Sequence, residues 1–128
     1  MSDGDEAFDA GLALRRAMFG PAGADEALRQ ASEFSRPLQE IVTRFCFGEV
    51  WQRPGLDKRT RSMLTIAMLI ASGRMAQLPG HVRGALANGV THEELRELIL
   101  HALLYCGIPA AVEATAGMPQ YSSACRIN

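Results

Sequence analysis

The chain has 128 residues, of which 48% are hydrophobic and 21% are charged. This length and balance indicate one packed domain spanning residues 1–128 and argue against extensive disorder. The formal net charge is −1, from 13 basic and 14 acidic residues, so no overall charge attracts nucleic acid or an anionic membrane. We therefore expect neither nucleic acid nor a membrane among the partners.

Targeting signals and metal motifs are not expected. The segment MSDGDEAFDAGLALRR is acidic at its start and lacks the apolar core of a secretory signal. The apolar stretch Met63–Ala71 is shorter than the roughly 20 residues that a membrane-spanning helix needs. Cys46, Cys106 and Cys125 form no CxxC pair, so neither a disulfide framework nor a zinc site is expected. These features predict a cytoplasmic protein without a metal.

Helical periodicity begins near the N-terminus. Apolar spacing predicts a helix over Asp5–Met18, which the Gly20-Pro21 pair should end, and a second short helix over Ala22–Glu33. A stronger helix is expected to start at Pro37 and to end near Trp51. Its predicted apolar face carries residues that step by three and four: Leu38, Ile41, Val42, Phe45 and Cys46.

The next two helices are bounded by clear start and stop signals. Arg53-Pro54-Gly55, here called the RPG loop, forces a turn, and Asp57 can cap a helix that runs to about Gly73. The second half of that helix is apolar on nearly every face, which predicts a place at the centre of a bundle or at a subunit interface. Another helix should begin near Pro79 and end at Asn88-Gly89.

The last clear helix starts with a capping box, Thr91-His92-Glu93-Glu94. Gly107-Ile108-Pro109 should stop it, and a final helix is expected from about Pro109. No strand alternation and no glycine-rich phosphate loop stand out, so the predicted class is all-α. The apolar face of the capped helix is predicted to contain Leu95, Leu98, Ile99, Ala102, Leu103 and Cys106.

Three histidines are candidates for catalysis. His92 lies in the first turn after a cap, where we expect it to be solvated. His101 lies on a helix that is predicted to be buried, where we expect a core histidine rather than a catalytic one. His81 follows Pro79-Gly80 near a helix start, where the helix dipole lowers the affinity of an imidazole for protons. From residue type and position alone, His81 is a candidate catalytic residue, although a structural histidine on an ordinary helix would look the same.

The end of the third predicted helix and the RPG loop carry further candidates. Glu49 and Trp51 lie where the helix gives way to the loop, which is a common place for functional residues, although an exposed glutamate and a packing aromatic would look the same. Arg53, Arg59 and Arg61 place three guanidinium groups around this turn, where they could bind carboxylates or simply form a solvated basic end.

Three segments carry a resemblance to a known family: GLALRRAMFG, QEIVTRFCFGEVWQRPGLDKRTRSMLTIAML and HVRGALANGVTHEELRELILHALLYCGIPAA. Together they resemble the 4-carboxymuconolactone decarboxylase branch of the carboxymuconolactone decarboxylase family, over about Gly11 to Ala111. The resemblance implies an alkylhydroperoxidase D-like bundle of about six helices. It also implies a homo-oligomer, either a trimer or a hexamer.

The peroxidase branch of this superfamily uses a CxxC pair four residues before its histidine. Aligning that histidine with His81 places Arg74 and Gln77 where the cysteines would be. Peroxide reduction through a dithiol therefore lacks its thiols and is disfavoured.

The resemblance implies a cofactor-independent decarboxylation of a small butenolide that bears two carboxylates. Electrons from the lost carboxylate would move through the ring double bond onto the lactone carbonyl, so the substrate is its own electron sink. His81 would be the acid or the oxyanion donor, and Arg53 and Arg61 would bind carboxylate. Glu49 would orient His81 or relay a proton, and Trp51 would wall the pocket.

The tail departs from the family pattern, because Gly117 and Pro119 interrupt a segment that is usually a regular helix. Leu78-Pro79-Gly80 is also unusually rigid and small, so the substrate can differ from that of the family. One alternative is a family member that acts on another lactone or activated acid as an isomerase, hydratase or lyase. Another is a catalytically silent oligomeric binding protein.

Overall fold

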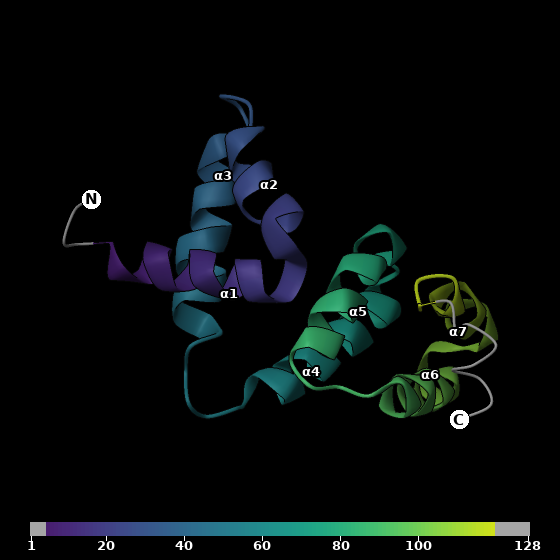
Figure 1. Ribbon diagram of the computed structural model, residues 1–128. Helices are drawn as coiled ribbons and strands as arrows, with labels where there is room; N and C mark the ends of the chain where they lie inside the picture. The colour runs from purple at the N-terminus through teal and green to yellow at the C-terminus, as the bar shows by residue number, and fades with distance from the viewer. Residues whose placement is uncertain (1–4, 120–128) are drawn as a thin grey trace.

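The computed structural model describes residues 5–119, and within this range every regular element is helical (Figure 1). The predicted all-α class is therefore confirmed. The elements are α1 (Glu6–Gly23), α2 (Asp25–Arg29), α3 (Arg36–Ile41), the π-helix η1 (Val42–Val50), α4 (Lys58–Ser72), the short 3₁₀-helix η2 (Met75–Gln77), α5 (Leu78–Ala87), α6 (His92–Cys106) and α7 (Ile108–Thr115).

The helices form two groups that meet where α1 packs against α5 (Figure 1). The first group comprises α1, α2, α3 and η1, and its core contains Leu14, Met18, Phe47 and Trp51. The second group comprises α4 to α7 around a larger core. Ile66, Ile70, Leu78 and Leu95 are among its most deeply buried side chains.

Two glycines allow the backbones of α1 and η1 to touch. A Cβ atom added to Gly11 would lie 1.8 Å from the carbonyl oxygen of Thr43, and one added to Gly48 would lie 1.9 Å from that of Ala7. Neither site has room for a methyl group, because the obstacle is backbone rather than a flexible side chain. The close crossing of α1 and η1 therefore depends on glycine at both positions.

The helix predicted from Pro37 to Trp51 is present, but most of it is π-helical. The residues buried most deeply on η1 are Thr43 and Phe47, whereas Leu38, Ile41 and Phe45 of the predicted apolar face are more than half exposed. Phe45 lies on η1, where the larger number of residues per turn means that spacing by three and four no longer identifies the buried face, whereas Leu38 and Ile41 lie on the α-helix α3, which has no buried residue. The predicted burial of these three side chains was wrong.

The predicted break at Gly20-Pro21 is a kink within α1. Gly20 has φ 75° and ψ 178°, and helical structure resumes and continues to Gly23. The helix predicted over residues 22–33 is reduced to one short helix, α2. Pro21 supports the new helical turn because proline is tolerated at a helix start but not in a helix interior.

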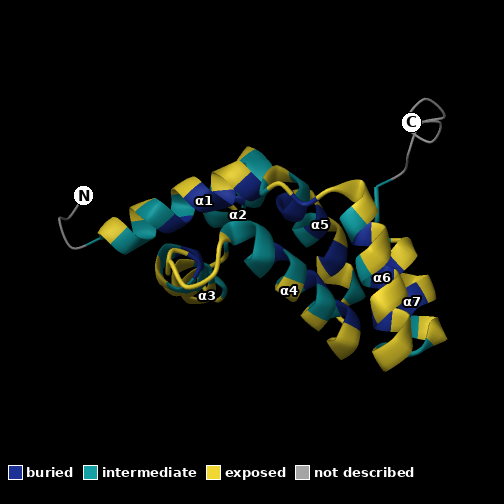
Figure 2. Cartoon of the chain, turned by 90° about the horizontal axis from the view of Figure 1, so that it is seen from below, coloured by how far each residue is buried: buried dark blue, intermediate teal, exposed yellow. Residues whose placement is uncertain are grey.

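The apolar helix α4 is buried along one face only. Ser62, Ile66 and Ile70 are buried, whereas Met68 is 65% exposed and Leu64 is 41% exposed. Exposed surface is also extensive on α6 and α7 (Figure 2). Large apolar side chains on these two helices that are exposed include Leu100, Leu103, Leu104, Tyr105, Ile108 and Val112.

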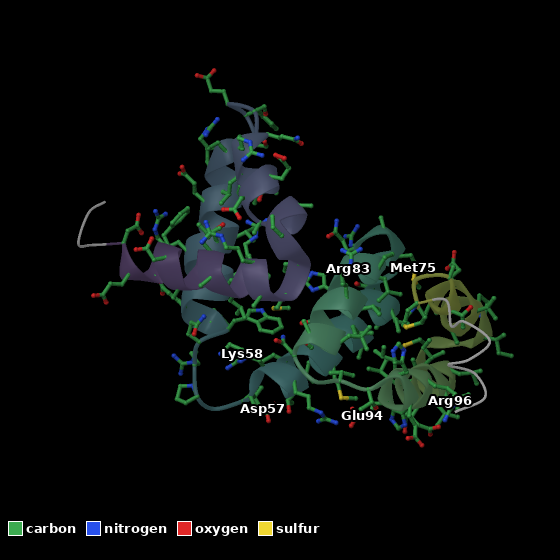
Figure 3. All side chains as sticks on the ribbon, viewed as in Figure 1. Asp57, Lys58, Met75, Arg83, Glu94 and Arg96 are labelled. Atoms are coloured by element: carbon green, nitrogen blue, oxygen red, sulfur yellow. The ribbon has the colours of Figure 1, made fainter. Side chains whose placement is uncertain are left out.

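Both predicted N-caps are confirmed. An Asp57 carboxylate oxygen accepts a hydrogen bond of 2.7 Å from the Thr60 amide, and the Thr91 hydroxyl accepts one of 3.0 Å from the Glu94 amide. The Glu94 carboxylate accepts from the Thr91 amide and also pairs with Arg59 of α4. Asp57 and Glu94 lie at adjoining ends of α4 and α6 (Figure 3), so the capping box also ties these helices together.

Replacing Thr91 with alanine should lower the free energy of unfolding by about 1 kcal/mol, because one N-terminal amide of α6 loses its acceptor. Urea denaturation followed by circular dichroism measures the change. Glu93→Gln is the control, since Glu93 is exposed in the same turn and has no part in the capping box. An equal loss in both variants would contradict the role of the cap.

The described chain covers only part of the unusual tail. Helix α7 ends at Thr115, and residues 116–119 follow it without regular structure, which agrees with the interruption expected at Gly117 and Pro119. The rest of the predicted departure, together with Cys125, lies outside the described residues. The described range contains no helix that is long and apolar enough to cross a membrane.

Candidate active site

His81 lies in the first turn of α5, just after Pro79, where α5 meets α1. Its imidazole packs edge-on against Phe19 of α1, with ring centroids 5.3 Å apart and an interplanar angle of 81°. Burial lowers the pKa of His81 below its ordinary value of 6.5, because the charged form loses solvation. Near neutral pH the ring is therefore mostly uncharged and offers one N–H and one acceptor nitrogen.

Aromatic rings connect His81 to the end of η1. Phe19 makes an edge contact with Phe47 at 5.7 Å between centroids, and Phe47 packs against Trp51 at 5.6 Å. Phe47 and Trp51 are 5% and 7% exposed, so water is excluded from this end of the row, whereas Phe19 and His81 are partly exposed. We call His81, Phe19, Phe47 and Trp51 the aromatic row. It brings two of the predicted site residues, His81 and Trp51, to its two ends.

Two polar side chains of the first helical group, Arg15 and Cys46, are at least half-buried. Arg15 of α1 is buried and donates a hydrogen bond of 2.9 Å to the Thr43 hydroxyl. Cys46 is half-buried, and burial raises the pKa of its thiol, an effect that the Arg15 charge and a side-chain hydrogen bond with Trp51 oppose. The raised pKa argues against a reactive thiolate at Cys46.

Arg53 and Arg61 are brought together by the RPG loop. Arg61 Nη2 donates a hydrogen bond of 3.1 Å to the carbonyl oxygen of Arg53, so the first turn of α4 holds the RPG loop in place. Arg61 Nε is buried without a hydrogen-bond partner in the described part of the chain, whereas the Arg53 side chain is exposed. Arg61 therefore has a free donor in a partly buried setting, which suits binding of an anion.

Glu49 has no described contact with His81, Arg53 or Arg61. Its side chain is exposed on η1, and the charge that it influences is that of Arg44, whose pKa it helps to raise. The described contacts of His81 include Phe19 but join it to neither Glu49, Arg53 nor Arg61. The roles predicted for these residues stay predictions.

The other histidines lie outside the aromatic row. His92 is exposed, as expected for its position in the first turn of α6. His101 is also exposed and packs against Tyr105 at 5.4 Å, so the prediction of a core histidine was wrong. The periodicity of α6 did not reveal this, because apolar residues also cover its exposed side. His101 borders an open groove of about 350 Å³ that is also lined by Met63, Glu94, Glu97 and Leu98.

Two residues of the site were missed in the sequence. Phe19 contacts His81, and Arg15 lies one helical turn before it on the same face of α1. Both are part of the segment GLALRRAMFG, which supported the resemblance without any role being given to it. An arginine in line with buried apolar residues of a helix, such as Leu14 and Met18, was the available signal.

Comparison with known proteins decides the family. The Carboxymuconolactone decarboxylase family matches residues 36–118. The chain belongs to this family. It is 47% identical to nitrosuccinic acid decarboxylase npaB of Metarhizium robertsii over 84% of this chain and 75% of that protein. It is 43% identical to 4-carboxymuconolactone decarboxylase of Acinetobacter baylyi over 84% of this chain and 80% of that protein.

A third relative is an uncharacterized 15.0 kDa protein of Paracoccus denitrificans, 34% identical over 75% of this chain and 73% of that protein. The names of the two more similar relatives confirm the prediction of a carboxy-lyase resembling 4-carboxymuconolactone decarboxylase. Among the residues that the structure describes, no cluster of histidine, cysteine and acidic side chains could hold a metal ion.

The burial of His81 predicts a dependence of stability on pH. Since its pKa is lowered in the folded state, the unfolded chain binds more protons below about pH 6.5. The contribution of neutral His81 is thus complete above pH 6.5 and is lost as the pH falls through the lowered folded pKa. His81→Leu should reduce the slope of unfolding free energy between pH 7 and pH 5, measured by urea denaturation. The same slope in wild type and variant, with His101→Gln as the control, would contradict the burial of His81.

Proposed function

We propose that this member of the family removes carbon dioxide from a small activated dicarboxylate, with 4-carboxymuconolactone as the first candidate substrate. The observation that carries the proposal is the position of His81, a half-buried and largely uncharged imidazole that packs against Phe19 at one end of the aromatic row. A half-buried hydrogen-bond donor at this place can stabilise negative charge that develops on a substrate oxygen.

The proposed reaction breaks one carbon–carbon bond and needs no external electron acceptor. The electron pair left by the departing carbon dioxide moves through the ring double bond onto the lactone carbonyl, which gives a dienolate. A proton then returns to a ring carbon. His81 donates a hydrogen bond to the enolate oxygen, and it can deliver the proton when it is in its protonated form. The lowered pKa favours the hydrogen-bonding part of this role at neutral pH.

The second candidate substrate is nitrosuccinic acid, which the name of the npaB relative supports. Loss of the carboxylate on its nitro-bearing carbon places the electron pair on the nitro group, so this compound also carries its own electron sink. Both candidates have two carboxylates and an acceptor group next to the carbon that loses carbon dioxide. An imidazole beside an apolar wall serves either reaction.

Arg61 is proposed to bind one substrate carboxylate, with Arg53 beside it. The free and buried Nε of Arg61 supports this role. Glu49 is kept as a proposed proton relay or orienting group, and Trp51 as a wall of the pocket. Arg61→Met should raise the KM for a dicarboxylate substrate by a factor of about 10, because a charge-assisted hydrogen bond is lost. Steady-state kinetics measure this, and an unchanged KM alongside intact folding would contradict the proposal.

The protein is further proposed to act in aromatic catabolism in the cytoplasm as a homo-oligomer, either a trimer or a hexamer. Exposed apolar side chains on separate surfaces support assembly: Leu38 and Phe45 lie on the first helical group, and Leu104 and Tyr105 on α6. Size-exclusion chromatography with light scattering tests this, and a 13.9 kDa monomer would contradict it.

Release of carbon dioxide tests the activity itself. The purified protein is incubated separately with 4-carboxymuconolactone and with nitrosuccinic acid, and carbon dioxide is measured against an uncatalysed control. Faster turnover of the lactone supports the first candidate, and faster turnover of the nitro compound supports the second. An intact oligomer with no release from either compound would favour the catalytically silent binding protein.

A further inference from the structure

Arg15 is a buried positive charge among neutral partners. The residue is 7% exposed. Its Nη1 donates one hydrogen bond of 3.1 Å to the side-chain oxygen of Gln39 and one of 2.9 Å to the hydroxyl of Thr43. Its Nη2 donates a hydrogen bond of 3.0 Å to the carbonyl oxygen of Gly23. These partners satisfy individual donors, but none of them carries a negative charge.

The hydrogen bonding of Arg15 is incomplete. Its Nε is buried and lacks a partner, and no carboxylate forms an ion pair with the residue in the described range 5–119. Burial lowers its pKa, which reflects the cost of keeping a guanidinium away from water. A buried cation without an anion is unfavourable unless a partner compensates its charge. The adjacent Arg16 differs, because it is exposed and forms a two-pronged bond with Asp25.

The fold places Arg15 beside the aromatic row. Arg15 and Phe19 are one turn apart on α1, and Phe19 contacts His81. On the facing helix η1, Thr43 contacts Arg15, and Phe47 contacts Phe19. The buried charge of Arg15 therefore lies at the same crossing of α1 and η1 as Phe19, one helical turn before the ring that packs against His81.

We propose that Arg15 is a substrate-binding residue whose Nε binds the second carboxylate of a dicarboxylate. The inference rests on the proposed function for the identity of the reaction. Arg15 and Arg61 are the two residues whose buried side-chain nitrogens lack a hydrogen-bond partner within the described chain, and in each case the atom is Nε. One guanidinium for each carboxylate would select dicarboxylates over monocarboxylates of the same size.

A purely structural role predicts different behaviour. Arg15 joins Gly23, after the kink of α1, to Gln39 and Thr43, so removing it should lower the melting temperature under either explanation. A structural residue, however, would affect the binding of all ligands alike. A residue that binds the second carboxylate would affect only those ligands that carry it.

The experiment compares succinate, which has two carboxylates, with succinamate, in which an amide replaces one of them. Trp51 is the single tryptophan of the chain and lies at the end of the aromatic row, so its fluorescence reports binding. We expect wild type to bind succinate at least about 10-fold more tightly than succinamate. Arg15→Met should reduce that ratio to near one. Arg15→Lys, which keeps a charge without the guanidinium fork, should retain part of the preference for succinate. This variant replaces Arg15→Met in the test if the methionine variant does not fold.

Two matched controls separate binding from folding. Arg16→Met removes the neighbouring charge, and Thr43→Val removes a structural partner of Arg15 while leaving its charge; both should keep the wild-type ratio. The proposal is overturned if wild type does not prefer succinate, or if both Arg15 variants keep the wild-type ratio. Since the readout is equilibrium binding, these outcomes are independent of carbon dioxide release, which tests the proposed reaction.

Discussion

Replacing His81 with alanine should reduce turnover by a factor of about 10² or more while the helices stay formed. The substitution removes the imidazole that is proposed to stabilise the enolate oxygen and to supply the proton. His81 lies in the first turn of α5, and alanine is a strong helix former, so the helix should persist. Carbon dioxide release under saturating substrate measures the loss, and circular dichroism measures helix content.

His101→Ala is the matched control for this result. His101 is exposed on α6, and the described residues that line its groove include no member of the aromatic row. Its replacement should leave turnover within about twofold of wild type. Turnover that is unchanged in His81→Ala would end the proposed catalytic role of His81, whatever the effect at His101.

Replacing Gly11 with alanine should destabilise the protein by more than about 3 kcal/mol. The new methyl group would lie 1.8 Å from the Thr43 carbonyl oxygen and 2.8 Å from its carbonyl carbon. These atoms belong to the backbone of η1, so the helices themselves would have to separate. A loss of this size is a large part of the stability of a small domain, and urea denaturation would detect it as a lower midpoint.

Gly80→Ala supplies the comparison in another helix. A Cβ atom at Gly80 would meet nothing within 4 Å, and the helix propensity of alanine should make the change neutral or stabilising by up to about 1 kcal/mol. Similar midpoints for the two alanine variants would show that α1 and η1 can separate without cost. That result would contradict the tight crossing.

Local signals in the sequence predicted much of the fold. Asp57 and Thr91 cap their helices as expected, because such caps depend on the residue itself and on amides a few positions away. The backbone path of residues 20–50 was harder to predict from the sequence. Gly20 kinks α1 without ending it, and no local motif marks the change to π-helix at Val42, where η1 packs against α1.

The candidate site was predictable only in part, because some of its contacts join helices that are far apart in the sequence. His81 and Trp51 could be selected by residue type and position, and they lie at opposite ends of the aromatic row. The rings between them, Phe19 and Phe47, come from helices distant in sequence, and spacing along the chain does not report such contacts. Arg15 was missed because its burial is a property of the crossing between α1 and η1.

The divided origin of the aromatic row affects how substrate choice can change during evolution. The region matched by the family begins at residue 36 and includes the helix of His81, whereas Phe19 and Arg15 belong to the preceding segment. Substitutions in that leading segment would alter the proposed substrate contacts of Phe19 and Arg15 while the imidazole and its own helix stay the same. A new acid could thus be accommodated by mutating α1 alone, with the chemistry inherited unchanged.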